Sequence, residues 1–166
     1  MKSLPWKLTV MASKVDDWLD GYAENHQNPI NKLIHWLCVP MIVLSIVGGL
    51  SAVPVPLTLA DVSPLFNLGT AFLICSLIYY TTISWSLALG MLPVVAVTIA
   101  LVSWLDQLPW PLAVTALAMF VVAWIGQFYG HWLEGKKPSF LKDMQYLMIG
   151  PLWMLAAVFR RLNLKY

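Results

Sequence analysis

The sequence predicts an all-α integral membrane protein: a helical bundle of four transmembrane helices, an N-terminal amphipathic helix and a C-terminal re-entrant or interfacial helical segment. Three observations predict this class. The chain is 60% hydrophobic and only 11% charged, against about 25% charged in an average soluble protein, so its apolar surface exceeds what a soluble core buries. Several apolar stretches reach the roughly 20 residues that a membrane span needs. No Lys or Arg lies between Lys32 and Lys136. The length predicts a single domain, 1–166.

The N-terminal segment 13–25 has apolar and acidic residues on opposite sides of a helix. The apolar side holds Val15, Trp18, Leu19 and Tyr22, and the acidic side holds Asp16, Asp17 and Asp20. This pattern predicts an amphipathic helix that packs on the protein or lies at the membrane interface. Asn28 and Pro29 then predict the start of the next helix, because Asn caps well and Pro is favoured at the first helical position.

The apolar stretches predict four spans, at 30–50, 64–83, 86–105 and 110–131. The apolar region 64–105 is too long for one span, and we divide it near Thr82–Ser86. A further stretch, 144–159, is short and is interrupted by Gly150 and Pro151. A break of this kind favours a re-entrant segment. An ordinary fifth span with a proline kink is the alternative.

The basic residues predict the orientation. They lie at the two ends of the chain: Lys2, Lys7, Lys14, Lys32, Lys136, Lys137, Lys142, Arg160, Arg161 and Lys165. Under the positive-inside rule, a cytoplasmic N-terminus and four spans return the 132–143 loop to the cytoplasm. A fifth full span would place the two arginines outside, so we expect 144–159 not to cross.

All three histidines of the chain fall at one membrane face in this topology. His26 precedes the first span, His35 lies near its start, and His131 lies at the end of the fourth. On the fourth helix, Gln127, His131 and Glu134 share a face, as do Asn31, His35 and Cys38 on the first. Ionisable residues in or beside spans usually face the bundle interior and serve function.

Three neutral imidazoles and one carboxylate suit a first-row metal such as Fe(II) or Zn(II). Each metal-binding histidine needs a partner that fixes its tautomer, and the candidates are Glu24, Asn25, Asn31 and Gln127. No HExxH or HxxHH motif is present, and three histidines are too few for a di-iron membrane hydroxylase. The formal charge is only +2, so the sequence does not indicate a basic surface that binds nucleic acid.

Two blocks carry a family resemblance: YAENHQNPINKLIHWLCVP and WIGQFYGHWLEGKKPSFLKDMQYLMIGPLWML. Together with the hydrophobic spans between them, they resemble the membrane-bound 2-hydroxy-fatty-acid dioxygenases of fatty acid α-oxidation. The resemblance implies an Fe(II) enzyme that needs O₂ but no 2-oxoglutarate. The implied substrate is a long-chain 2-hydroxy fatty acid, and the implied product is a fatty acid one carbon shorter.

The resemblance also implies site residues. The iron ligands would be His26, His35 and His131, and Glu134 would be a fourth ligand or a base beside the metal. From its position on the face of His131, Gln127 is a second candidate catalytic residue. The chain length and the sequence EGKKPSFLKD favour a bacterial member of this family. We therefore expect the bacterial inner membrane, with the metal near its cytoplasmic face.

Two other functions stay open at the level of the residues. A zinc-dependent hydrolase of lipid amides would use the same histidines, with Glu134 as its base. A non-enzymatic lipid-binding membrane protein would bind no metal, and alanine at the histidines would leave its function intact.

Overall fold

The computed structural model describes residue 19, residues 26–55, residue 63, residues 65–135 and residues 146–166. These residues form helices and connecting turns, with no strand among them, so the predicted all-α class is confirmed. The helices are α2 (Pro29–Ser51), α4 (Leu68–Ile83), α5 (Trp85–Leu105), α6 (Leu112–Leu133) and α8 (Ile149–Arg161). The expected amphipathic helix at 13–25 lies outside the described residues, apart from Leu19.

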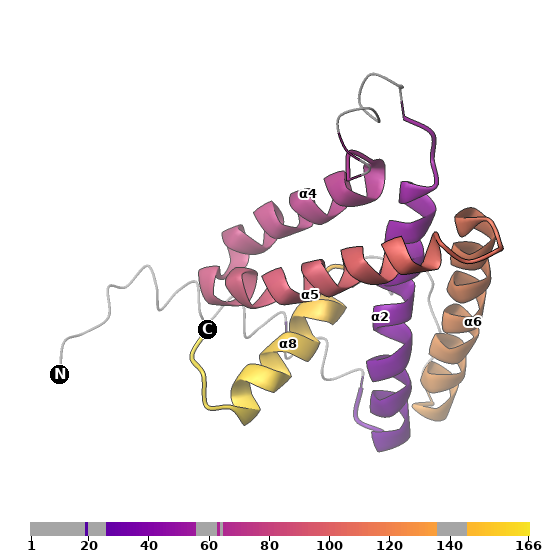
Figure 1. Cartoon of the computed structure of the whole chain (residues 1–166). Helices are drawn as coiled ribbons and strands as arrows, with labels where there is room; N and C mark the ends of the chain where they lie inside the picture. The colour runs from indigo at the N-terminus through magenta and orange to yellow at the C-terminus, as the bar shows by residue number, and fades with distance from the viewer. Residues whose placement is uncertain (1–18, 20–25, 56–62, 64, 136–145) are drawn as a thin grey trace.

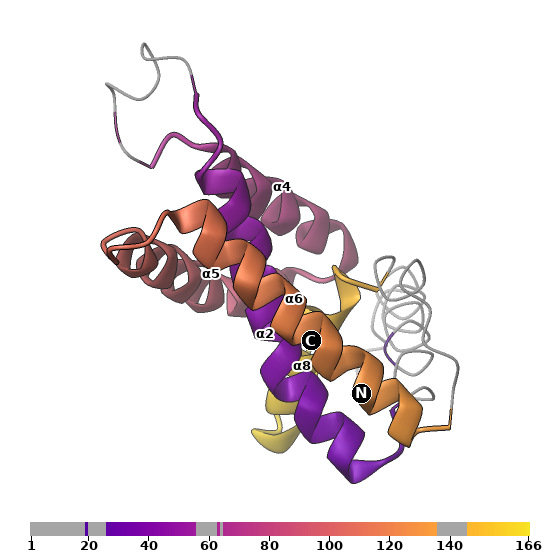
Figure 2. The same ribbon diagram turned by 90° about the vertical axis from the view of Figure 1, so that its right-hand side faces the viewer.

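Two pairs of helices make up most of the fold. Helices α2 and α6 lie side by side, and α4 and α5 form a second pair that runs across α2 instead of alongside it (Figure 1). Helix α8 contacts both α2 and α5. Figure 2 shows α6 running along the length of α2. The two blocks of sequence that hold the histidines are therefore brought together by the α2–α6 pair.

Glycines allow α2 and α6 to approach closely. A Cβ added at Gly126 would lie 2.6 Å from Cys38 Sγ, and one at Gly130 would clash with Asn31 Oδ1. The two glycines are four residues apart, the small-xxx-small spacing that lets helix backbones pack tightly in membranes. Glycine at these two positions keeps the histidine-bearing faces of the helices in contact.

Two predicted helix boundaries are confirmed by the structure. Asn28 caps α2 by accepting hydrogen bonds from the N–H groups of Ile30 and Asn31, and Pro29 takes the first helical position. The division of 64–105 near Thr82–Ser86 is confirmed, because Ser84 is extended and separates α4 from α5. The Ser84 side chain accepts from Leu87 N and so caps α5.

The predicted count of four spans is not confirmed. Helices α2, α5 and α6 are long and apolar enough to cross a membrane. Helix α4 is apolar but has only 16 residues, fewer than the roughly 20 of a typical span. The sequence pattern extended this segment back to residue 64, whereas the helix begins at Leu68 after the Asn67 cap.

The interruption predicted within the C-terminal segment is wrong, whereas its re-entrant or interfacial placement stays a prediction. Gly150 and Pro151 do not interrupt it, because α8 begins at Ile149 and both residues lie in its first turn. Proline is tolerated there, where its missing N–H leaves no helical hydrogen bond unmade. With 13 residues, α8 is about 20 Å long, short of the roughly 30 Å hydrocarbon core.

Candidate metal centre

The three histidines meet in one buried cluster. His26 lies just before α2, His35 lies two turns into α2, and His131 lies in the last turn of α6. Their side chains are 3%, 3% and 6% exposed, respectively. One potential ligand atom from each lies within 4.8 Å of the others. The predicted topology placed all three histidines at one membrane face, and the structure brings their rings into contact distance.

The rings pack edge to face and tilted against one another. The ring centroids are 4.2 Å apart for His26 and His35, 5.1 Å for His35 and His131, and 5.7 Å for His26 and His131. None of the pairs is stacked face to face. Nitrogen atoms of the three rings can therefore turn toward a common point between α2 and α6.

The structure defines the tautomer of His35. Its Nδ1 lies 3.0 Å from the backbone oxygen of Asn31. A carbonyl oxygen only accepts, so Nδ1 carries a proton, and in the neutral ring Nε2 then has the lone pair. Metal-binding histidines commonly donate their second N–H to a backbone carbonyl in this way. Asn31 was predicted as such a partner, and it acts through its main chain.

Glu134 joins the end of α6 to the start of α2. Its Oε1 accepts from Gln27 N at 2.7 Å, and its Oε2 accepts from Asn28 N at 3.0 Å and from Asn31 Nδ2 at 2.8 Å. Both carboxylate oxygens are thus directed at amide N–H groups beside His26. In this geometry Glu134 holds the segment that carries His26 against α6.

The surroundings of Glu134 favour its carboxylate form. Burial on its own raises the pKa of the carboxyl group. The hydrogen bonds from Asn31, Gln27 and Asn28, with the nearby His26 ring, favour the carboxylate and lower the pKa of Glu134 overall. The charge therefore strengthens the hydrogen bonds that join α6 to α2.

Gln127 lies beside the histidine cluster. It is 4% exposed and sits one helical turn before His131 on the same face of α6. With His35, Trp124 and Tyr146 it lines a small cavity of about 30 Å³. Its amide therefore lies next to the space that adjoins the cluster.

The donor set fits a first-row metal ion. Three imidazole nitrogens evenly placed around one ion at about 2.1 Å lie at most about 3.6 Å apart. The nitrogens here lie within 4.8 Å of one another, so binding one ion would require each to move inward by up to about 0.7 Å. Three buried imidazoles within this distance are a common environment for Zn(II), Fe(II) or Cu(II).

Sequence reasoning missed two features of the site. The GxxxG spacing of Gly126 and Gly130 would have predicted the close approach of α6 to α2. Trp153 of α8 packs near the cluster, with its ring centroid 6.1 Å from that of His26. No sequence signal distinguished Trp153 from the other tryptophans, because its position depends on how α8 folds back.

The fold and the cluster define a class: an all-α protein with helices that can span a membrane and a three-histidine site suited to a metal. A family model described as 2-hydroxy-palmitic acid dioxygenase Mpo1-like matches residues 12–162. The chain belongs to this family, as its resemblance to the 2-hydroxy-fatty-acid dioxygenases predicted. No curated protein and no solved structure matches the chain in the corresponding comparisons.

Proposed function

We propose that this protein is an Fe(II)-dependent dioxygenase that converts a long-chain 2-hydroxy fatty acid into the fatty acid one carbon shorter. The observation that carries the proposal is the buried cluster of His26, His35 and His131, with ligand atoms within 4.8 Å of one another. Membership of a family described by its 2-hydroxy-palmitic acid dioxygenase supports the substrate class.

The three histidines are proposed as the iron ligands. Three protein nitrogens leave coordination positions open, and a bound Fe(II) would supply the capacity to chelate the substrate and to activate O₂. The hydroxyl and carboxylate of a 2-hydroxy acid are adjacent, so they suit chelation by one ion. A plain fatty acid lacks the hydroxyl and therefore lacks half of this recognition.

The substrate can supply all the electrons for the reaction. One 2-hydroxy acid and one O₂ give the shortened fatty acid, CO₂ and water, with all atoms balanced. The bond between the carboxyl carbon and the carbon bearing the hydroxyl breaks. These two carbons together lose four electrons, the number that reduces one O₂ completely. Neither 2-oxoglutarate nor a nicotinamide is then required as a reductant.

The remaining residues orient the ligands and the substrate. The Asn31 carbonyl holds the ring of His35, and Glu134 holds the segment that carries His26. Glu134 is therefore proposed as a positioning residue, since its oxygens accept from amide groups. Gln127, next to His35 in the small cavity, is proposed to donate a hydrogen bond to the polar end of the substrate.

The proposed location is the bacterial inner membrane, with the metal centre near the cytoplasmic face. The basic residues at the two ends of the chain support this orientation through the positive-inside rule. A site at the membrane surface would receive its substrate from the lipid and its metal from the aqueous side.

Purified protein with Fe(II) and O₂ tests the proposal. It should shorten 2-hydroxypalmitic acid by one carbon and leave palmitic acid unchanged, as measured by mass spectrometry of the acyl products. An iron chelator should stop the reaction, and omission of 2-oxoglutarate and NADPH should not. Shortening of palmitic acid, or a strict need for 2-oxoglutarate, would contradict the assignment of the electron source.

A further inference from the structure

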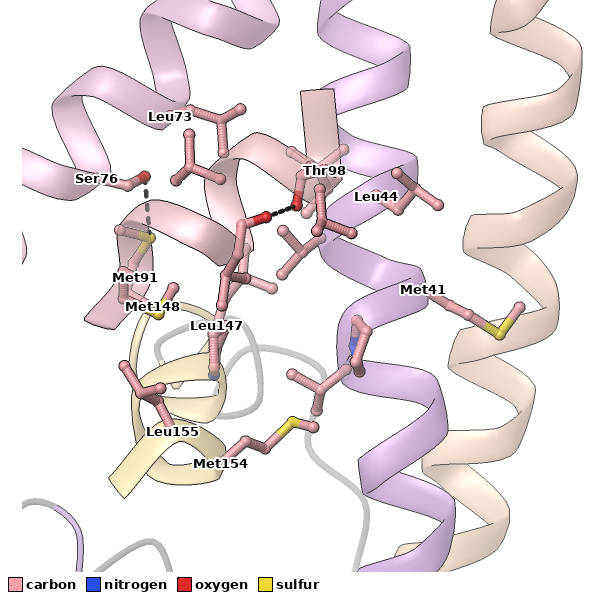
Figure 3. A pocket seen from close by; sticks show the side chains of 18 of the residues that line it. Met41, Leu44, Leu73, Ser76, Met91, Thr98, Leu147, Met148, Met154 and Leu155 are labelled. Carbon is pink, nitrogen blue, oxygen red and sulfur yellow. Dashed lines mark hydrogen bonds between the residues drawn. The ribbon is translucent and has the colours of Figure 1, made fainter. Parts of the chain in front are cut away.

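A large apolar cavity lies next to the metal centre. We call it the chamber; its volume is about 650 Å³, and its walls come from α2, α4, α5, α8 and the residues just before α8. Figure 3 shows side chains from these elements around one space, with Leu73 and Ser76 at one side and Met154 and Leu155 at another. The volume lies within the roughly 300–1,000 Å³ of small-molecule sites.

The wall of the chamber offers little that a polar ligand could bind. No charged residue lines it in the described part of the chain. Its three hydroxyl groups are directed at backbone carbonyls: Ser76 Oγ donates to Phe72 O, Thr98 Oγ1 to Val94 O and Tyr80 OH to Met148 O, each at 2.8 Å. The chamber therefore presents a hydrocarbon-like surface.

Methionine makes this surface adaptable. Four of the chain's 8 methionines line the chamber: Met41, Met91, Met148 and Met154. Methionine side chains are flexible and polarizable, and they fit apolar ligands of variable shape. An alkyl chain, which has many conformations and no polar groups, is the ligand that such a wall suits.

The chamber adjoins the small cavity beside His35. Val39 and Leu147 line both spaces. Val39 lies four residues after His35, so the two side chains occupy the same face of α2. A ligand in the chamber could therefore place one end between Val39 and Leu147 and reach the histidine cluster with it.

The chamber has about the length of one lipid chain. Its lining on α2 extends from Trp36, next to His35, to Ile46. Eleven residues of α-helix separate His35 from Ile46, a rise of about 16 Å. A single lipid chain fills half of the roughly 30 Å hydrocarbon core, which is about 15 Å. The chamber lining on α2 therefore matches the depth of one lipid chain.

We propose that the chamber binds the alkyl chain of the 2-hydroxy acid, with the carboxyl end directed past Val39 and Leu147 to His35, and that its depth limits the chain length of the substrate. This inference rests on the proposed function for the identity of the polar end. The proposed occupant of the chamber is the alkyl chain of the substrate. The experiments below distinguish it from a membrane phospholipid, which would contradict the proposal.

The first experiment shortens the chamber. Leu44 lies nine residues after His35 and lines the far part of the chamber. Leu44→Trp should lower kcat/KM for 2-hydroxypalmitic acid by roughly tenfold or more, because a long chain would fit the apolar pocket poorly. The kcat/KM for the shorter 2-hydroxydecanoic acid should stay unchanged. Leu37→Trp is the matched control, since Leu37 is on the same helix, is 63% exposed and lies outside the chamber. Equal losses for both substrates in Leu44→Trp would overturn the proposal.

The second experiment uses the unmodified protein and needs no turnover. A 2-hydroxypalmitic acid with a diazirine at the end of its chain is photolysed with the protein, and the adducts are mapped by mass spectrometry. We expect adducts on the α4 and α5 lining, around Phe72 and Thr98, that unlabelled 2-hydroxypalmitic acid removes. Adducts on the exposed α6 face around Leu117, or equal competition by phosphatidylcholine, would refute the chamber as the site.

The labelling also separates the chamber from the proposed reaction. If the adducts on the α4 and α5 lining form but the wild-type protein shortens no 2-hydroxy acid, the chamber stands and the proposed reaction fails.

Discussion

Replacement of Gly130 by alanine is expected to disturb the candidate metal centre without changing a histidine. The added Cβ would clash with Asn31 Oδ1 and would lie 3.4 Å from Asn31 Cγ and from Ile34 Cγ2. Asn31 has little freedom to yield, because its side chain is 0% exposed and its Nδ2 donates to Glu134 Oε2 at 2.8 Å. The clash is therefore expected to move α6 away from α2 and to break this hydrogen bond.

The magnitude follows from three terms. Overpacking of a close helix contact costs about 1–3 kcal/mol. Loss of the hydrogen bond from Asn31 to the charged Glu134 costs about 1.5–3 kcal/mol. Alanine is a better helix former than glycine, which stabilises the folded variant by about 1 kcal/mol. The free energy of unfolding should thus fall by about 1.5–5 kcal/mol.

Gly49→Ala is the matched control for this substitution. Gly49 is also helical, on α2, and the nearest atom to its added Cβ is Ala116 Cβ at an ordinary 4.0 Å. Denaturant unfolding in detergent and metal content should be measured for both variants. Gly130→Ala should lose stability and lower metal affinity by about 10–100-fold, as for other losses next to metal ligands, while Gly49→Ala should keep both. Equal stability and equal metal content in the two variants would refute the role of this contact.

Three further predictions concern other parts of the fold. Glu134→Gln retains one accepting oxygen and should keep its metal while turnover falls about 10–100-fold; complete loss of the metal would contradict a purely positioning role for Glu134. Tyr80→Phe removes the hydrogen bond to Met148 O and should lower the free energy of unfolding by about 1 kcal/mol, measured by denaturant unfolding; an unchanged value would show that this bond does not anchor the residues before α8. Single cysteines placed at Lys137 and Lys165 in a background without native cysteines should label from the same side of the membrane; labelling from opposite sides would show that the C-terminal segment crosses.

Much of the fold was predictable because its signals are local. The capping of α2 by Asn28 depends on the adjacent residues only, as does the break at Ser84. The family resemblance rests on contiguous blocks in the same way and is confirmed by the match over 12–162. The predicted break at Gly150 and Pro151 was wrong, because these residues suit either a break or a first helical turn.

The arrangement of the site was only partly predictable because it depends on contacts between distant residues. Helical spacing placed Gln127, His131 and Glu134 on one face, and α6 indeed turns the two buried residues, Gln127 and His131, inward. The hydrogen bonds of Glu134 to Gln27 and Asn28 join residues more than a hundred positions apart. Helical spacing does not predict contacts between such distant residues. The role of Glu134, as a ligand or as a base, was therefore left open by the sequence.

The metal content of anaerobically purified protein tests the central claim most directly. Elemental analysis of the wild-type chain should give one iron per chain. Alanine at His26, His35 or His131 should lower the iron content in each single variant, since each ring contributes to the cluster. Stoichiometric zinc in place of iron would contradict the dioxygenase, and full metal content in all three variants would contradict the site.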